Sequence, residues 1–297
     1  MRVFVTGASG LIGSAVTADL IAAGHEVLGL ARSDDAAAAI TAAGGTPLPG
    51  SLDDLDSLRA GAAETDATVH LGYKHDYSNM EASGHTERAA LEAMLAVLEG
   101  TGRPFAFASG VAGLTPGRLT TESDVSPHVG PDAMRGGAEQ LAFSYVDRDV
   151  RSIALRFAPT VHGEGDHGFV ARIAGAAASA GVSSYVGDGQ SRWPAVGRMD
   201  AARLAVLALE NAPAGTVVHA VDEEGIATRD IAEAIGAVLG VPTTSITAEE
   251  AVERLGFVGR FFGLDTPASS DLTRRRLGWT PTAQGLLADI AAGYYTP

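Results

Sequence analysis

The sequence predicts an α/β protein, in which a doubly wound parallel sheet is accompanied by a smaller α/β domain toward the C-terminus. Three observations predict this fold class. Strand-like and helix-like segments alternate through the first half of the 297 residues, as is typical of parallel sheets. The first apolar run leads directly into a glycine-rich turn and then a helical pattern. Beyond residue 160 the periodicity weakens and Gly and Pro become denser, as expected for a smaller second domain.

The glycine-rich turn spans residues 6–13, with the sequence TGASGLIG, and follows the apolar run 3–5. A helix is predicted to follow, because apolar residues recur at i, i+4 and i+8 at Ile12, Val16 and Leu20. Strand, glycine turn and helix together form the context in which such a pattern indicates a dinucleotide site. A glycine turn without a ligand is the alternative.

Each glycine of the turn has an expected role. Gly7 permits the tight turn, Gly10 allows a pyrophosphate to approach the backbone, and Gly13 allows close packing of helix on sheet. The phosphates would lie at the helix N-terminus, where free N–H groups and the helix dipole favour anions. The cofactor contacts expected here are Gly7, Ser9, Gly10, Leu11 and Ile12.

The other elements follow in order along the chain. In the first half, strands are expected at residues 26–31, 46–49, 66–71, 105–109 and 151–157, and helices at 36–43, 86–99 and 132–147. In the second half, a strand is expected at 216–221 and helices at 201–211, 228–239, 247–255 and 282–292. Thr247 and Glu250 predict a capping box at the start of one of these helices.

The end of strand 26–31 bears on the choice of cofactor. Folds of this type that prefer NAD usually carry an acid here for the ribose hydroxyls, whereas an Arg accommodates a 2′-phosphate. Ala31 stands at the acid position, and Arg32 and Ser33 follow it. NADP(H) is therefore the predicted cofactor, with Arg32 and Ser33 among its contacts. A solvated Arg at a strand end is the alternative.

The turn TGASGLIG resembles that of the extended branch of the short-chain dehydrogenase/reductase superfamily. The resemblance covers nearly the whole chain, through HLGYKHDYSN, ASGVAGL, RFAPTVHG and SRWPAVGRMDAARL, and is to an atypical, epimerase/dehydratase-like subgroup. It implies a Rossmann-type domain at 1–160, to which 200–221 returns, and a substrate-binding cap at 161–199 and 222–297. It also implies further cofactor contacts at Ser51 (where the family commonly has Asp), Leu52, Leu71, Gly72, Tyr73, Ser109, Arg135 and Pro159.

The catalytic dyad typical of the superfamily is missing. Its members normally use a Tyr as acid/base and a Lys four residues later, which lowers the pKa of the Tyr. Counting back from Glu139 and Gln140, the Tyr position falls on Pro131 and the Lys position on Arg135. If the protein is an enzyme, another group must donate the proton.

Four residues are candidate catalytic groups: Ser109, His75, Tyr73 and His162. Tyr73 and His75 belong to a run of seven protic side chains, 73–79, just past the carboxyl end of a predicted strand, where such sheets bind ligands. Ser109 ends another strand and could bond a carbonyl oxygen. His162 stands where the family commonly has Tyr, and histidine exchanges protons near neutral pH. A structural role is the alternative for each.

Three functions fit these observations. The first is an NADPH-dependent reductase of a small or medium carbonyl compound with a non-standard proton donor. The second is a non-catalytic NADP(H)-binding sensor, for which a missing dyad would be typical. The third is a nucleotide-sugar epimerase or dehydratase, which Arg192 and Asp200 favour and the missing Tyr disfavours. The order of preference is reductase, sensor, epimerase.

Composition limits the partners. The chain has 21 basic and 36 acidic residues, a net charge of −15, which disfavours nucleic acid and anionic lipid. It has no cysteine, so no disulfide or thiolate is available. No metal is expected, because the spacing of His162, Glu164, Asp166 and His167 does not place them on one helix face. With no evident signal peptide or spanning segment, we expect a cytoplasmic protein, and the family resemblance suggests a homodimer.

Overall fold

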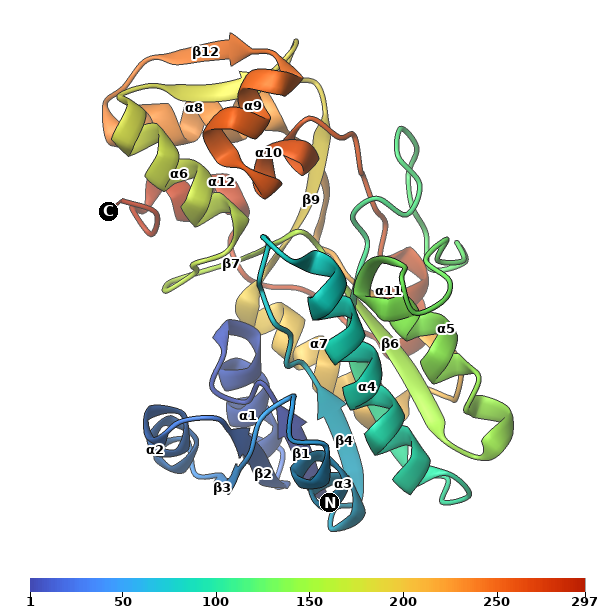
Figure 1. Cartoon of the computed structure of the whole chain (residues 1–297). Coiled ribbons are helices and arrows are strands. Elements are labelled where there is room, and N and C mark those ends of the chain that lie inside the picture. Colours follow the sequence, from blue (N-terminus) through green and yellow to red (C-terminus); the bar gives the residue numbers. More distant parts are fainter. Residues whose placement is uncertain (297) are drawn as a thin grey trace. The chain divides into compact units, whose positions relative to one another are not determined.

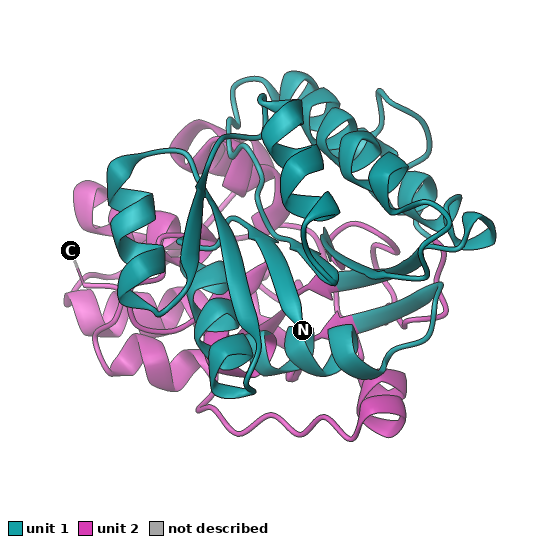
Figure 2. Cartoon of the chain, turned by 90° about the horizontal axis from the view of Figure 1, so that it is seen from below, with its two compact units in different colours: residues 1–109, 126–155, 202–218 teal, residues 110–125, 156–201, 219–297 magenta. Residues whose placement is uncertain are grey.

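The computed structural model describes residues 1–296 and contains two compact units (Figure 2). Unit 1 consists of Met1–Ser109, Ser126–Leu155 and Ala202–Val218, and unit 2 consists of Gly110–Val125, Arg156–Ala201 and the described residues from His219 onward. The segment Gly110–Val125, which the predicted first domain included, groups with unit 2.

Unit 1 is built on a seven-stranded sheet with the order β10-β6-β5-β4-β1-β2-β3 (Figure 1). Its strands are β1 (Arg2–Thr6), β2 (Glu26–Ala31), β3 (Thr46–Pro49), β4 (Ala67–His70), β5 (Pro104–Gly110), β6 (Arg151–Phe157) and β10 (Thr216–Ala220). The pairings from β3 through β2, β1 and β4 to β5 are parallel. This order reverses direction at β1, so the predicted doubly wound Rossmann-type fold is confirmed.

The helices that accompany this sheet are α1 (Leu11–Ala22), α2 (Asp34–Ala42), α3 (Leu55–Ala63), α4 (Met80–Leu98), α5 (Ala138–Phe143) and most of α7 (Arg198–Asn211). Side-chain caps fix several helix starts. Ser33, Asp54 and Asn79 accept backbone N–H groups three residues ahead, at the start of α2, α3 and α4. The cap at Asn79 starts α4 six residues before the predicted start at residue 86.

The predicted helix at 132–147 is wrong. The structure has a short 3₁₀ segment η1 (Met134–Gly137), then α5, then a second 3₁₀ turn η2 (Val146–Arg148). Arg135, Gly136 and Gly137 all have positive φ, of 54°, 61° and 64°. Three successive left-handed residues cannot belong to a right-handed α-helix, so the helical pattern is interrupted there.

One face of the sheet packs against α3, α4 and α5. Its buried core includes Phe4, Leu58, Leu91, Met94, Phe105 and Phe107. Gly61 on α3 permits close packing, because a Cβ there would lie 2.5 Å from the ring of Phe4. This packing positions α4 against the sheet, and α4 carries one of the site residues described below.

Unit 2 contains a three-stranded sheet with the order β11-β9-β7 and a parallel pair of strands, β12 and β8. The strands are β7 (Thr160–His162), β8 (Ser183–Val186), β9 (Arg192–Gly197), β11 (Glu223–Ala227) and β12 (Thr243–Ile246). The helices are α6 (Phe169–Ala180), α8 (Thr228–Leu239), α9 (Ala248–Leu255), α10 (Phe257–Phe262), α11 (Asp271–Leu277) and α12 (Leu286–Ala291). Trp193, Ile231, Ile235, Phe262 and Ile290 are fully buried in its core.

The capping box predicted from Thr247 and Glu250 is present at the start of α9. The helix predicted at 282–292 begins instead at Leu286. Among residues 1–296, no helix combines the length and apolar character that a membrane span requires.

Candidate functional site

The glycine turn has the geometry that the sequence predicts. Gly7 has φ of +70°, and a Cβ there would lie 2.8 Å from the backbone nitrogen of Gly72. A Cβ at Gly13 would lie 1.9 Å from the carbonyl oxygen of Gly7. Both positions therefore exclude any larger residue, Gly7 through backbone conformation and contact, and Gly13 through helix packing.

The N-terminus of α1 is open to an anion. Gly10 is its N-cap, no side chain caps it, and its first turn has no acidic residue. Ser9 and Gly10 are exposed, and Leu11 and Ile12 are half-buried. Because no side chain caps the first N–H groups of this 12-residue helix, its N-terminus favours a negatively charged group.

A hollow of about 310 Å³ lies beyond the ends of β2 and β3. It is lined by Ala31, Arg32, Ser33, Asp34, Ala37, Pro49, Gly50, Ser51 and Asp54. The Arg32 side chain is exposed and forms no ion pair with any residue in the described part of the chain. The structure thus brings three predicted cofactor contacts, Arg32, Ser33 and Ser51, to one hollow.

A second set of polar groups is buried at the carboxyl end of β4. Thr6 pairs with His70 in the parallel register of β1 and β4, and Thr6 Oγ1 lies 2.7 Å from His70 Nδ1. Thr6 Oγ1 also accepts the backbone N–H of Gly72 at 3.0 Å. On its other side, His70 Nε2 faces Glu87 Oε2 at 3.6 Å, and both side chains are inaccessible to solvent.

Glu87 connects this set to the position where the family has Lys. Arg135 donates from Nη2 to Glu87 Oε1 at 2.8 Å. Burial opposes ionisation of Glu87, yet Arg135 and His70 together hold the pKa of this carboxyl below its ordinary value. The ion pair in turn raises the pKa of Arg135. Glu87 is thus a buried carboxylate with an adjacent guanidinium.

Arg135 also stacks on Tyr73. Its guanidinium carbon lies 4.4 Å from the centre of the Tyr73 ring, within cation–π range. The Tyr73 hydroxyl is buried and makes no hydrogen bond within residues 1–296. Burial raises the pKa of the Tyr73 phenol above its ordinary value, while Arg135 acts to lower it and Glu87 to raise it. An orphaned buried phenol of this kind calls for an explanation, and a role in proton transfer is one.

The backbone around Arg135 is built for close approach to α4. A Cβ at Gly136 would lie 2.4 Å from the carbonyl oxygen of Gly84 and 2.8 Å from the Cβ of Arg88. Arg88 also donates to the carbonyl of Gly136 at 3.0 Å. These contacts hold η1 on α4 and bring Arg135 to Glu87.

The remaining candidates in unit 1 have partners of their own. The hydroxyl of Ser109 donates to Glu139 Oε1 at 2.6 Å, so its one proton is engaged. His75 is exposed, lies edge-on to Tyr73 with ring centres 5.3 Å apart, and bonds Tyr77 at 3.3 Å. Leu71 donates its N–H to the carbonyl of Thr6. The catalytic roles of Ser109 and His75 stay predictions.

His162 and Pro159 belong to unit 2. His162 Nδ1 lies 2.6 Å from Asp289 Oδ2, its Nε2 lies 3.9 Å from Glu223 Oε2, and only 1% of its side chain is exposed. These contacts tie β7 to α12 and the start of β11, and they are what a structural histidine makes. Its catalytic role stays a prediction.

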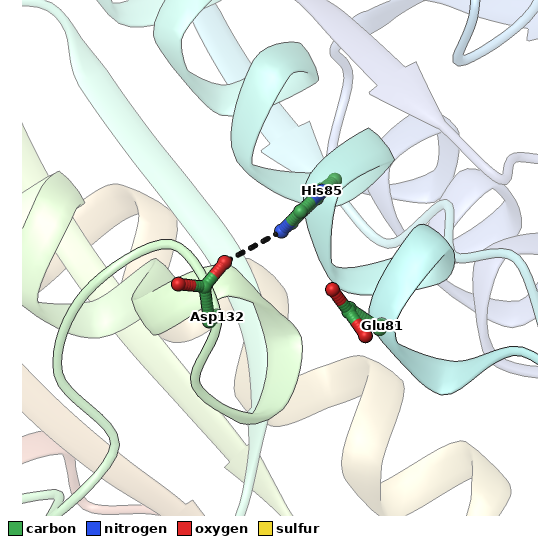
Figure 3. A group of neighbouring side chains, drawn as sticks. All are labelled: Glu81, His85 and Asp132. Atoms are coloured by element: carbon green, nitrogen blue, oxygen red, sulfur yellow. Dashed lines mark hydrogen bonds and ion pairs between the residues drawn. The ribbon is translucent and has the colours of Figure 1, made fainter.

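Glu81, His85 and Asp132 form an exposed group whose possible ligand atoms lie within 4.8 Å of one another (Figure 3). Glu81 and His85 are one turn apart on α4, and His85 bonds Asp132 at 3.0 Å. All three side chains are exposed, so nothing desolvates the group or fixes it for an ion.

Sequence reasoning missed Glu87 and gave His70 no chemical role. A signal for Glu87 was present, since it precedes Ala90 by three residues and Met94 by seven, on the inward face of α4. A carboxylate among apolar positions of one helix face indicates a buried charge that needs a partner. The partner itself could not be identified from spacing, because Arg135 is 48 residues away.

Comparisons with known proteins agree with this architecture. Residues 3–221 match the model of the NAD dependent epimerase/dehydratase family. A protein of Schizosaccharomyces pombe described as uncharacterized is 46% identical over 296 residues, which cover 99% of this chain and 100% of that protein. A quinoline-oxide ketoreductase of Stigmatella aurantiaca is 32% identical over 149 residues, 48% of this chain and 45% of that protein. The structure of the dTDP-glucose 4,6-dehydratase DesIV from Streptomyces venezuelae, with NAD bound, superimposes with a TM-score of 0.80 at 19% identity, covering 99% of this chain and 96% of that one.

Proposed function

Since the chain belongs to the NAD dependent epimerase/dehydratase family, we propose that it is an NADPH-dependent reductase of small or medium carbonyl compounds, with Tyr73 as proton donor. The observation that carries this proposal is the buried, unpartnered hydroxyl of Tyr73, whose ring lies beneath the guanidinium of Arg135. A phenol next to a fixed cation is the chemical pair of the superfamily's dyad. Here the two residues come from different elements of the fold.

The residues of unit 1 fit a dinucleotide. The uncapped N-terminus of α1 would hold the pyrophosphate, with Gly10 allowing its close approach, while Gly7 and Gly13 shape the turn and the helix packing around it. The hollow at Arg32, Ser33 and Ser51 would hold the adenosine end, with Arg32 against a 2′-phosphate. Asp34 and Asp54 also line this hollow, and Asp54 is engaged as the N-cap of α3.

The proposed reaction is a carbonyl reduction. When bound, NADPH supplies the hydride that adds to the carbonyl carbon. Tyr73 Oη gives its proton to the carbonyl oxygen as negative charge develops there, so an O–H bond forms and the phenol becomes a phenolate. Arg135 lies close enough to stabilise that phenolate, which regains a proton from water.

The ketoreductase of Stigmatella aurantiaca supports reduction over the alternatives. Its printed name describes a ketone reductase, and it aligns with about half of this chain. The alternative hypothesis of an epimerase or dehydratase has support from the family description and from the structural similarity to DesIV. The absence of a Tyr at Pro131 counts against that reading, because sugar oxidation would need a base there.

The proposal is tested by titrating the full chain with NADPH and with NADH, following nicotinamide fluorescence, and then assaying a panel of aliphatic and aromatic aldehydes and ketones. We expect reversible binding that favours NADPH and turnover of one or more carbonyl compounds. NADPH binding without any turnover would favour the sensor, and NADH that copurifies and does not dissociate would favour the epimerase. Absence of binding would contradict the dinucleotide site.

The substitution Arg32→Ala tests the choice between the two nucleotides. We expect NADPH affinity to fall by about 10-fold or more, with little change for NADH, because only NADPH carries the 2′-phosphate. Arg59→Ala is the matched control, since Arg59 is another exposed arginine of unit 1, on α3, and pairs with Asp56. Equal losses for NADPH and NADH would contradict the role of Arg32.

A further inference from the structure

Glu87 is a buried carboxylate that the proposed reaction does not use. It lies on α4 with 1% of its surface exposed. Its Oε1 accepts from Arg135 at 2.8 Å, and its Oε2 is buried without a hydrogen bond, 3.6 Å from His70 Nε2. A carboxylate is expensive to bury, and an apolar residue at this place in the helix would pack without that cost. A purely structural account therefore leaves the choice of Glu unexplained.

The position of Glu87 makes it the counter-ion of the proposed catalytic pair. Arg135 is held by Glu87 at one end and stacks on the Tyr73 ring with its guanidinium face. Gly136 and Gly84 allow η1 to approach α4 closely enough for this ion pair. On the other side of the carboxylate, His70 Nε2 lies 3.6 Å from Glu87 Oε2, and His70 is held in place by the 2.7 Å contact of its Nδ1 with Thr6 Oγ1. Glu87 can therefore not turn away from Arg135.

We propose that Glu87 is a positioning residue that fixes Arg135 on Tyr73 and cancels its charge, so that Tyr73 rests as a neutral phenol and the site acts as an acid. This inference rests on the proposed function and specifies its direction: reduction of a carbonyl, which consumes a proton, in preference to oxidation of an alcohol. Oxidation would need Tyr73 as a phenolate base. In the dyad typical of the superfamily, by contrast, the Lys lowers the pKa of the Tyr.

The groups that act on Tyr73 come from three elements. Arg135 on η1 favours the phenolate, whereas Glu87 on α4 and Tyr77 on the same loop oppose it. His75 faces the ring from the same loop, and Glu139 acts on Arg135 from α5. Burial is the main cause that disfavours the phenolate, and it sets the pKa of Tyr73 above its ordinary value despite Arg135. Removing Glu87 leaves Arg135 as the dominant charge.

The test is a pH titration of phenolate absorbance in the nucleotide-free full chain. To isolate the absorbance of Tyr73, the spectrum of each protein is corrected by subtracting that of the same protein with the additional substitution Tyr73→Phe. In Glu87→Gln we expect the midpoint of Tyr73 to fall by about one pH unit or more, since a cation within a few ångström shifts a pKa by 1–3 units. In Arg135→Met it should rise. Glu92→Gln, which removes an exposed carboxylate from α4, should leave it unchanged.

A midpoint in Glu87→Gln that is unchanged or higher would overturn the inference. If Glu87→Gln does not fold, as circular dichroism would reveal, Arg135→Met is compared with the double variant Arg135→Met/Glu87→Gln, in which no buried charge is left unpaired. The double variant should then titrate at lower pH than Arg135→Met, and an equal or higher midpoint would overturn the inference.

The pH profile of turnover provides a second readout. The alcohol-oxidation rate of Glu87→Gln should rise at lower pH than that of the wild-type protein, because its phenolate forms earlier, and an unshifted profile would overturn the inference. The phenolate titration needs neither nucleotide nor substrate. A shifted midpoint in a protein that binds no NADPH would therefore contradict the proposed function and leave the electrostatic role of Glu87 supported.

Discussion

Arg135 combines an unusual backbone with an unusual environment. Its φ of 54° is uncommon for a residue with a Cβ, and such strain persists only where the surrounding structure over-determines the conformation, as it often does at functional sites. In this conformation its side chain makes two contacts, an ion pair with Glu87 and a stack on the Tyr73 ring. A Lys here would supply the charge without the planar group that stacks. An Arg in place of the expected Lys thus suits the proposed use of Tyr73 as proton donor.

Tyr73→Phe removes the proposed proton donor and keeps the ring that Arg135 covers. We expect kcat for carbonyl reduction to fall by about 10² to 10⁴-fold, with NADPH affinity changed little, because the hydroxyl is used in the chemical step. Steady-state kinetics and nucleotide titration measure the two quantities. Tyr145→Phe is the matched control, since Tyr145 is also stacked by an arginine, Arg148, and lies in the core of unit 1. Full activity in Tyr73→Phe would eliminate Tyr73 as the donor.

At the scale of elements, the site depends on how closely η1 approaches α4. Sequence periodicity favours one helix over residues 132–147, whereas the chain uses three left-handed residues to turn Arg135 toward Glu87. Glycine is required at 136 because a Cβ would collide with the backbone of Gly84. The local cost of a broken helix is offset by contacts that form only after folding.

Gly136→Ala should separate η1 from α4. We expect the free energy of unfolding to fall by about 1–3 kcal/mol, from positive φ and from overpacking, and carbonyl reduction to weaken as Arg135 moves. Chemical denaturation and the reductase assay measure these effects. Gly130→Ala serves as control, because Gly130 has φ of +88° with nothing within 4 Å of its Cβ position. Equal effects of the two substitutions would mean that the contact with α4 does not matter.

At the scale of the whole molecule, acidic residues outnumber basic ones, so the pairing of individual carboxylates bears on stability in acid. In unit 2, Asp124 accepts from Arg118 Nη2 at 2.5 Å and from the backbone N–H of Thr121 at 2.7 Å. The hydrogen bond from Arg118, supported by the one from Thr121, holds the pKa of Asp124 well below its usual range. A lowered pKa contributes stability above the unfolded value of about 4, and that stability is lost as pH falls below it.

Asp124→Asn should therefore lower the free energy of unfolding at neutral pH, and the difference from the wild-type protein should shrink as the pH falls below about 4. Salt should also reduce the difference, because Arg118 is exposed. Denaturant unfolding at several pH values measures it. Asp271→Asn alters an exposed ion pair, in which Asp271 Oδ2 lies 3.7 Å from Arg275 Nη1, and it should have little effect on the free energy of unfolding at any pH. A loss of stability that does not depend on pH would contradict this account of Asp124.

Much of the fold follows from local patterns. The glycine turn, the alternation of strands and helices and the capping box at Thr247 depend on residues within a few positions of one another, so spacing alone predicts them. The order of the strands in the sheet comes from the structure. Helix boundaries were less accurate where a cap or a left-handed residue decided them, as at Asn79 and Arg135. Two candidate residues, Arg32 and Tyr73, adjoin predicted strand ends. The structure places Arg32 at a hollow and Tyr73 beside Arg135, and their roles stay predictions.

The sequence by itself determined the fold class, the family, the glycine turn and the absence of the usual dyad. Each of these can be identified from short motifs or from the succession of segments along the chain. Only the tertiary structure brought Tyr73, Glu87 and Arg135 together, from a loop after β4, the inner face of α4 and the broken helix at η1. Tyr73 and Arg135, 62 residues apart in the chain (135 − 73), and Glu87, 48 residues before Arg135, meet there through packing of the sheet and α4 and through the close glycine contacts. Spacing along the chain does not predict these contacts, because the side chains of Tyr73, Glu87 and Arg135 come within contact distance only once the core has formed.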